Sequence, residues 1–102
     1  MVGVYIKTID FVDSNGEHRR SPYSVVACKY DGTNIQEVLG VAGKYVVLPD
    51  DGQPFPVILT HHTTYVLSPD RYVVIDPQYV KPLLYTSEEF EAKFQFVQKW
   101  EA

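Results

Sequence analysis

The hydrophobic pattern along the chain predicts short β-strands separated by turns rich in proline and glycine. Apolar and polar positions alternate over residues 4–12, which indicates a strand, and the slip in the alternation predicts a bulge near Thr8. Residues 23–30 are mostly apolar at their centre, which indicates a strand buried on both faces. Between these strands, Asn15-Gly16 predicts a type I′ hairpin turn, and Ser21-Pro22 is expected to break the pairing.

The middle of the chain predicts one short helix. Asp31-Gly32 is a turn signal, and a short segment with apolar residues at helical spacing follows it. Either residue of Thr33-Asn34 is a suitable cap, and Glu37 stands at capping-box distance from the second of them. We expect one or two helical turns that end at Gly40 and Gly43.

The strands expected after this helix are short and are separated by proline-marked turns. Pro54 and Pro56 confine the start of one strand to a sheet edge, and Pro82 does the same for another or marks a bulge. The expected strands are residues 44–48, 55–59, 65–67, 72–75 and 79–85, and the expected turns are residues 49–52, 68–71 and 76–78.

The last part of the chain predicts an amphipathic helix. Thr86-Ser87 supplies the cap, and with Thr86 as the capping residue Glu89 falls at the third helical position, where it completes a capping box. Phe90, Phe94 and Val97 then share one face, which we expect to lie on the sheet.

Together these elements predict one α+β domain over residues 1–102. We expect a small, strongly bent, mainly antiparallel β-sheet of six to seven strands, or a partly open barrel, with a short central helix and a C-terminal amphipathic helix. A chain of 102 residues has the usual size of a single domain. Because exposed edges are expected at Pro56 and Pro82, we also expect a homo-oligomer that covers them.

Composition narrows the possible partners. The net charge of −4, with acidic residues spread along the chain, argues against binding of duplex nucleic acid. No apolar run approaches the ~20 residues of a membrane helix, so we expect no membrane partner. The single cysteine, Cys28, cannot form an internal disulfide, which fits a reducing cytoplasm.

The residue types that usually carry catalysis or metal binding have simpler explanations here. His61 and His62 are adjacent and would point to opposite faces of a strand, so no metal site is expected. Cys28 has apolar neighbours and no nucleophile motif, and is interpreted as a buried structural thiol. The glutamates near the C-terminal helix are explained by capping and solvation. We therefore expect no catalytic residues, no metal and no cofactor, and predict that the protein is not an enzyme.

Several short motifs resemble those of a family of small tailed-bacteriophage proteins with no settled role. That family has a V-x-A strand, a D-G-T-N turn and a C-terminal P-G-D-Y-(I/V)-(I/V) strand followed by F-x-x-x-(Y/F). The residues that carry the resemblance are Arg20-Ser21-Pro22, Val25-Val26-Ala27, Asp31-Gly32-Thr33-Asn34, residues 68–74, and the segment from Glu89-Phe90 to Phe94. The chain departs from the pattern where the glycine of P-G-D is missing and Arg71 is inserted. The resemblance implies a phage protein made in the host cytoplasm, and it transfers no site residues.

These observations favour a non-enzymatic binding protein that acts in counter-defence or host takeover. The first hypothesis is sequestration of a small phosphorylated, nucleotide-like ligand, because arginine forks suit phosphates and tyrosine rings can stack on a base. One alternative is inhibition of a host protein through an acidic aromatic surface, and another is a minor virion or assembly component. The candidate ligand-binding residues are Arg19, Arg20, Tyr30, His61, Arg71, Tyr72 and Tyr85.

Overall fold

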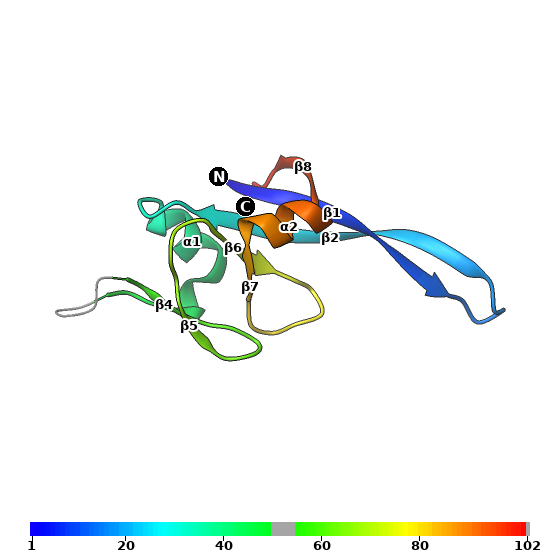
Figure 1. Ribbon diagram of the computed structural model, residues 1–102, viewed down its shortest axis with the longest axis horizontal. Helices are drawn as coiled ribbons and strands as arrows, with labels where there is room; N and C mark the ends of the chain where they lie inside the picture. Colours follow the sequence, from blue (N-terminus) through cyan, green and yellow to red (C-terminus); the bar gives the residue numbers. More distant parts are fainter. Residues whose placement is uncertain (50–54, 102) are drawn as a thin grey trace.

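The computed structural model describes residues 1–49 and 55–101, which form two antiparallel sheets and two α-helices (Figure 1). The five-stranded sheet has the order β7-β6-β2-β1-β8 and contains β1 (Val2–Val12), β2 (His18–Tyr30), β6 (Arg71–Ile75), β7 (Leu83–Thr86) and β8 (Gln95–Lys99). The three-stranded sheet, β3-β4-β5, contains β3 (Val46–Val47), β4 (Val57–Leu59) and β5 (Thr64–Val66). The helices are α1 (Ile35–Ala42) and α2 (Ser87–Lys93). The predicted α+β class is confirmed, with no closed barrel in the described part of the chain.

The five-stranded sheet is buried on both faces around β2. Val25 and Ala27 belong to the apolar cluster beneath α2, which includes Phe90. Cys28 and Tyr30 belong to a second cluster with residues of α1. Because successive side chains of a strand point to opposite faces, one strand supplies both clusters. The burial on both faces predicted for this segment is therefore confirmed.

The paired strands β1 and β2 extend well beyond the rest of the sheet. Their register is unbroken along the whole length of β1, but β8 reaches along β1 only to Ile6 and β6 reaches along β2 only to Val26. Residues 7–23, which we call the arm, therefore project as a two-stranded ribbon (Figure 1). The molecule measures 58 × 26 × 26 Å as a result.

Three predictions about this hairpin are wrong in detail. The bulge near Thr8 is absent from the β1–β2 pair, and the irregularity lies instead in the pairing of β1 with β8, next to Val4. Pro22 does not break the pairing, because β6 does not reach it and its missing N–H costs no bond at a free edge. The turn is longer than type I′: Asp13 accepts from two backbone N–H groups, and only Gly16 takes a positive φ, of 81°.

Helix α1 starts at the predicted place and ends next to Gly43, the second of the two predicted stops, but it is not stopped by Gly40. It runs through Gly40 to Ala42 and is followed by a 3₁₀ turn, η1 (Gly43–Tyr45). Asn34 is the capping residue, yet its side chain makes no bond to the first helical N–H groups, so the capping box predicted with Glu37 is wrong. The strand expected at residues 44–48 is reduced to β3, and the turn expected at residues 49–52 lies largely outside the described residues.

Helix α2 has the predicted capping box, but it ends earlier than predicted. The Thr86 side chain accepts from the Glu89 N–H, and the Glu89 side chain accepts from the Thr86 N–H. The helix ends at Lys93 because Phe94 is extended, with φ −120° and ψ 146°. The chain then forms β8, so Val97 lies on an exposed strand and not on a buried helix face, contrary to the prediction.

The two prolines expected at exposed edges are both buried. Pro56 precedes β4, which is the central strand of its sheet, and its carbonyl accepts from Leu67 N–H at 2.8 Å. Pro82 precedes β7, an edge strand as predicted, but its side chain is fully buried. Neither proline therefore lies at a solvent-exposed strand edge. Neither helix in the described part of the chain has the length and apolar character needed to cross a membrane.

Candidate functional site

A pocket lies where the base of the arm meets β7 and the loops beside it. Its volume is about 250 Å³, slightly below the ~300–1,000 Å³ typical of small-molecule sites. Its lining comes from β1, β2, β7, the connection between β6 and β7, and the loop after β4: Lys7, Ile9, Tyr23, His62, Asp76, Gln78, Tyr79, Leu83, Leu84 and Tyr85. We call this the tyrosine pocket.

Three tyrosines give the pocket its aromatic character. The Tyr23 hydroxyl donates to the Asp76 carboxylate, which also accepts from the Gln78 N–H at 2.9 Å. Desolvation and the adjacent carboxylate raise the pKa of Tyr23 to about 12, so its hydroxyl remains a neutral donor. Desolvation also raises the pKa of Tyr85. Tyr79 and Tyr85 donate no hydrogen bond within the described residues, so their hydroxyls are available to a ligand.

Lys7 is the cation of the tyrosine pocket. Its ammonium lies 5.7 Å from the ring centre of Tyr23 and 5.3 Å from that of Phe94. It makes no ion pair with a carboxylate among residues 1–49 and 55–101. An ammonium held against aromatic rings and without a counter-ion is suited to binding an anionic group.

The two histidines lie at the rim of this pocket. They occupy the bend after β4 and not a strand, and their ring centres are 5.2 Å apart, so the prediction that they face opposite sides is wrong. The His61 ring lies 4.4 Å from the ring of Tyr79, and the backbone N–H of His61 donates to Pro82. Residues 1–49 and 55–101 contain no cluster of histidine, cysteine and acidic residues that could hold a metal ion.

The candidate residues chosen from sequence do not form one site, but three of them lie in or beside the tyrosine pocket. Tyr85 lines the tyrosine pocket and His61 stacks against its rim. Arg71 lines a neighbouring hollow of about 220 Å³ between β5 and β7, which Tyr85 also borders. The structure therefore brings together Tyr85 with His61 on one side and with Arg71 on the other.

The other four candidates lie apart from the tyrosine pocket. Arg19 pairs with Asp13 at 2.5 Å, and Arg20 pairs with Asp10 at 3.0 Å, both in the exposed arm. Tyr30 and Tyr72 are 5% and 6% exposed and belong to the two apolar clusters, which leaves their rings no open face for stacking. The Tyr72 hydroxyl donates to Glu91 at 3.1 Å, and burial raises its pKa.

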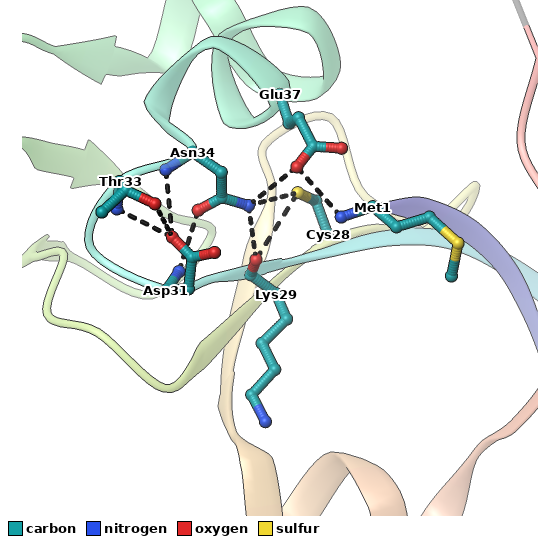
Figure 2. A network of polar contacts seen from close by, with 7 residues as sticks. All are labelled: Met1, Cys28, Lys29, Asp31, Thr33, Asn34 and Glu37. Atoms are coloured by element: carbon teal, nitrogen blue, oxygen red, sulfur yellow. Dashed lines mark hydrogen bonds and ion pairs between the residues drawn. The ribbon is translucent and has the colours of Figure 1, made fainter.

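The D-G-T-N motif forms a network of polar contacts with neighbouring residues (Figure 2). The Asp31 carboxylate accepts from the backbone N–H and hydroxyl of Thr33 and from the backbone N–H of Asn34. The Asn34 amide donates to the Lys29 carbonyl at 2.8 Å and to Glu37 at 3.1 Å. Gly32, at φ 96°, provides the left-handed residue of the turn. The motif fixes the junction between β2 and α1.

Cys28 lies beneath the same network. It is fully buried, and burial raises its pKa to about 11. The Asn34 amide lies 3.7 Å from its sulfur. The predicted burial of this cysteine is confirmed, and a protonated, buried thiol is a poor nucleophile.

Sequence reasoning missed most residues of the tyrosine pocket. Lys7 and Tyr23 are cross-strand partners in the β1–β2 register, and Asp76 binds Tyr23 across 53 positions of sequence. Counting outward from the two-residue turn predicted at Asn15-Gly16 pairs Lys7 with Ser24, one position from the observed partner Tyr23, so the predicted hairpin indicated the neighbourhood of this pair but not its register. No local pattern signals the contact with Asp76.

Comparison with known proteins adds no relative. A scan against protein-family models finds none that matches, and searches of the curated proteins and of the solved structures find no match either.

Proposed function

We propose that this chain is a non-enzymatic binding protein that holds a small nucleotide in the tyrosine pocket. One observation carries the proposal: the Lys7 ammonium, which has no ion pair within the described residues, lies beside the Tyr23 ring in a pocket of about 250 Å³ that Tyr79 and Tyr85 also line. Aromatic rings stack on bases of any sequence, and a lysine binds phosphate as a point charge.

The polar groups of the pocket suggest how the ligand is oriented. Asp76 accepts hydrogen bonds and repels phosphate, so it favours the base end of a nucleotide, where an exocyclic amino group donates. Lys7 favours the phosphate end. The volume of about 250 Å³ favours a mononucleotide over a dinucleotide. Adenosine 5′-monophosphate carries both an amino group on the base and a single phosphate, and it is the probe that this arrangement favours.

The biological role proposed with this activity is sequestration of a host nucleotide by a phage protein. It rests on the resemblance of the sequence motifs to a bacteriophage family and on the lack of a convergent nucleophile, base and oxyanion donor among the residues that line the tyrosine pocket. Sequestration requires only tight binding, which the tyrosine rings and the Lys7 ammonium supply without a chemical reaction.

Calorimetric titration with AMP and with adenosine tests the proposal. The Lys7→Met variant keeps the apolar stem over Tyr23 and removes the charge, so we expect AMP affinity to fall about ten- to hundredfold, since a charge-assisted bond contributes ~1.5–3 kcal/mol. Adenosine affinity should stay within about twofold. AMP recovered after heat release should be chemically unchanged.

A matched control is Lys44→Met, because Lys44 also lies over a tyrosine ring, that of Tyr45 at 5.1 Å, but outside the pocket. The control should bind AMP as the unmodified protein does. Absence of saturable AMP binding, or equal losses in both lysine variants, would reject the proposal, and conversion of the nucleotide would reject the non-enzymatic assignment.

A further inference from the structure

Two strand edges face each other across the hollow between β5 and β7 (Figure 1). β5 ends the three-stranded sheet and β7 ends the five-stranded sheet. Residues 65–66 of β5 and residues 84–86 of β7 line the hollow from its two sides. The edges touch at one end only, where the backbone N–H of His61 donates to the Pro82 carbonyl at 3.1 Å. The hollow therefore lies where the two sheets separate.

The strand register shows which backbone groups of β7 point toward β5. Asp13 N–H donates to the Glu17 carbonyl, and from this pair the hydrogen-bonded positions alternate through β1, β2 and β6. The alternation continues into the β6–β7 pair, where it directs the N–H and C=O of Tyr85 to β6. The N–H and C=O of Leu84 therefore point away from β6. The carbonyl two positions earlier, which accepts from His61, points the same way.

Leu84 is the position of β7 that remains available for pairing on this side. The Pro82 carbonyl is already bonded to His61. The Thr86 N–H donates to the Glu89 carboxylate, and as the capping residue Thr86 gives its carbonyl to the first bond of α2. No strand in residues 1–49 or 55–101 pairs with the outward groups of Leu84. This edge thus offers one donor and one acceptor.

β5 offers the same kind of groups from the opposite side. Leu67 N–H donates to the Pro56 carbonyl, and Thr60 N–H donates to the Thr63 carbonyl, so the odd-numbered positions bond to β4. Val66, at an even-numbered position that lines the hollow, points its N–H and C=O away from β4. An extended peptide carries donors and acceptors on both of its edges, whereas a simple anion carries acceptors alone. The two edges therefore suit a peptide strand.

The charge of the hollow favours an acidic peptide. Arg71 lines the hollow and faces Thr86 in the β6–β7 register. Its Nε lies 3.5 Å from the Ser68 hydroxyl, and it makes no ion pair among residues 1–49 and 55–101. A guanidinium whose outer nitrogens are open binds a carboxylate in bidentate form.

The two carboxylates near Arg71 have donors of their own. Glu89, which also lines the hollow, accepts from the N–H and the hydroxyl of Thr86 at 3.2 and 3.0 Å. Asp70 accepts from the hydroxyl of the first residue of α2 at 2.8 Å and pairs with Lys29 at 3.1 Å. Neither carboxylate lies within ion-pair distance of Arg71, so the arginine keeps its capacity for an incoming acid.

We propose that this hollow is a docking site for an extended, acidic segment of another protein. One residue of the segment pairs with Leu84 through two backbone hydrogen bonds, and its other edge faces Val66. The acidic residue lies two positions along, beside Thr86, because alternate side chains of a strand share a face and Arg71 shares this face with Leu84. Main-chain bonds supply affinity and the carboxylate supplies specificity. The proposal does not depend on a ligand in the tyrosine pocket.

Titration with a short peptide, followed by amide NMR spectra of the full chain, tests the site. The probe is a capped pentapeptide with threonine at its centre, valine on either side and glutamate at both ends, so that an acid stands two positions from the centre in either strand direction. Saturable shifts of the Leu84 and Val66 amide signals are expected. The same peptide with glutamine at both ends should bind about three- to tenfold more weakly, the range for a partly exposed charge pair. Methylation of the central amide nitrogen should abolish binding.

Two arginine variants test the charge contact. Arg71→Gln should lower the affinity for the glutamate peptide about three- to tenfold and leave that for the glutamine peptide within about twofold. Arg20→Gln is the matched control, because Arg20 lies in the arm and pairs with Asp10 there. It should bind both peptides as the unmodified protein does. No saturable shift at millimolar peptide, shifts that avoid Leu84 and Val66, or equal losses in both variants would each overturn the proposal.

Discussion

At the residue scale, single carboxylates hold the loops of this protein. Asp31 accepts bonds from two successive backbone N–H groups and one hydroxyl, so a single side chain satisfies three donors of the exposed turn after β2. Hydrogen bonds to the charged form hold its pKa below the ordinary value of 3.8, chiefly those from Thr33. Asp13 plays the same part at the tip of the arm.

The lowered pKa of Asp31 predicts a specific dependence of stability on pH. A carboxyl whose pKa is lower in the folded state contributes stability that is fully present above its unfolded value near 3.8 and is lost as pH falls through the folded value. We expect Asp31→Asn to be less stable than the unmodified protein at pH 7. The two proteins should be equally stable at a pH below both the unfolded and the folded pKa of Asp31. Urea unfolding followed by circular dichroism from pH 7 to pH 2.5 measures this.

Glu88→Gln is the control for that measurement. Glu88 is exposed in the first turn of α2, and its side chain makes no hydrogen bond within the described residues. Its difference from the unmodified protein should change little over the acid range in which the Asp31→Asn difference disappears. A gap between Asp31→Asn and the unmodified protein that persists below both pKa values would contradict the assignment.

Residues with local partners were predicted better from sequence than residues with distant partners, although the predicted box of Asn34 with Glu37, also three positions apart, does not form. The Thr86–Glu89 box spans three positions, so its geometry follows from helix spacing alone. By contrast, the pairing of Arg19 with Asp13 and the burial of Tyr72 depend on a completed hairpin and sheet. Charge and aromatic type alone therefore marked as candidate binding residues several side chains that the fold uses for stability.

At the element scale, the chain after α2 illustrates the competition between helix and strand. Phe90 and Phe94 share a helical spacing with Val97, which predicted a longer helix. Phe96 and Val97 also favour strands, and β1 offers an unpaired edge beside them, so pairing with β1 as β8 ends the helix. A pattern of seven residues cannot settle this, because the deciding partner lies at the other end of the sequence.

Two glycines in different elements predict opposite effects of the same substitution. Gly40 lies inside α1, and a Cβ added there meets nothing within 4 Å, so Gly40→Ala should stabilise the protein by about 0.5–1 kcal/mol. A Cβ at Gly3 of β1 would lie 2.9 Å from the Phe96 ring and 3.0 Å from the Tyr5 ring, so Gly3→Ala should destabilise by about 1 kcal/mol through overpacking. Thermal and urea unfolding of both variants test the signs, and a stabilising Gly3→Ala would contradict the packing of β8 on β1.

At the scale of the whole molecule, one sheet separates two cores. Phe90 is the largest fully buried side chain of the cluster beneath α2, and Val38 is fully buried in the cluster beneath α1. The two clusters share no residue, yet adjacent positions of β6, Val73 and Val74, belong to one each. The architecture could be predicted from strand patterns, but the division of the core could not, because it depends on which face each helix covers.

This shared sheet predicts that the two cores unfold together. Val38→Ala should lower the free energy of unfolding by about 1–3 kcal/mol and Phe90→Leu by about 1–2 kcal/mol, since both remove volume from close-packed sites. Neither core can lose its sheet without exposing the other, so each variant should shift a single transition. The backbone N–H of Trp100 donates to the Val2 carbonyl of β1, so Trp100 fluorescence reports on the β8 edge. Circular dichroism reports on the whole chain. Coincident transitions by both probes in both variants are expected; a Val38→Ala variant in which circular dichroism changes before the Trp100 signal would mean that the two faces fold independently.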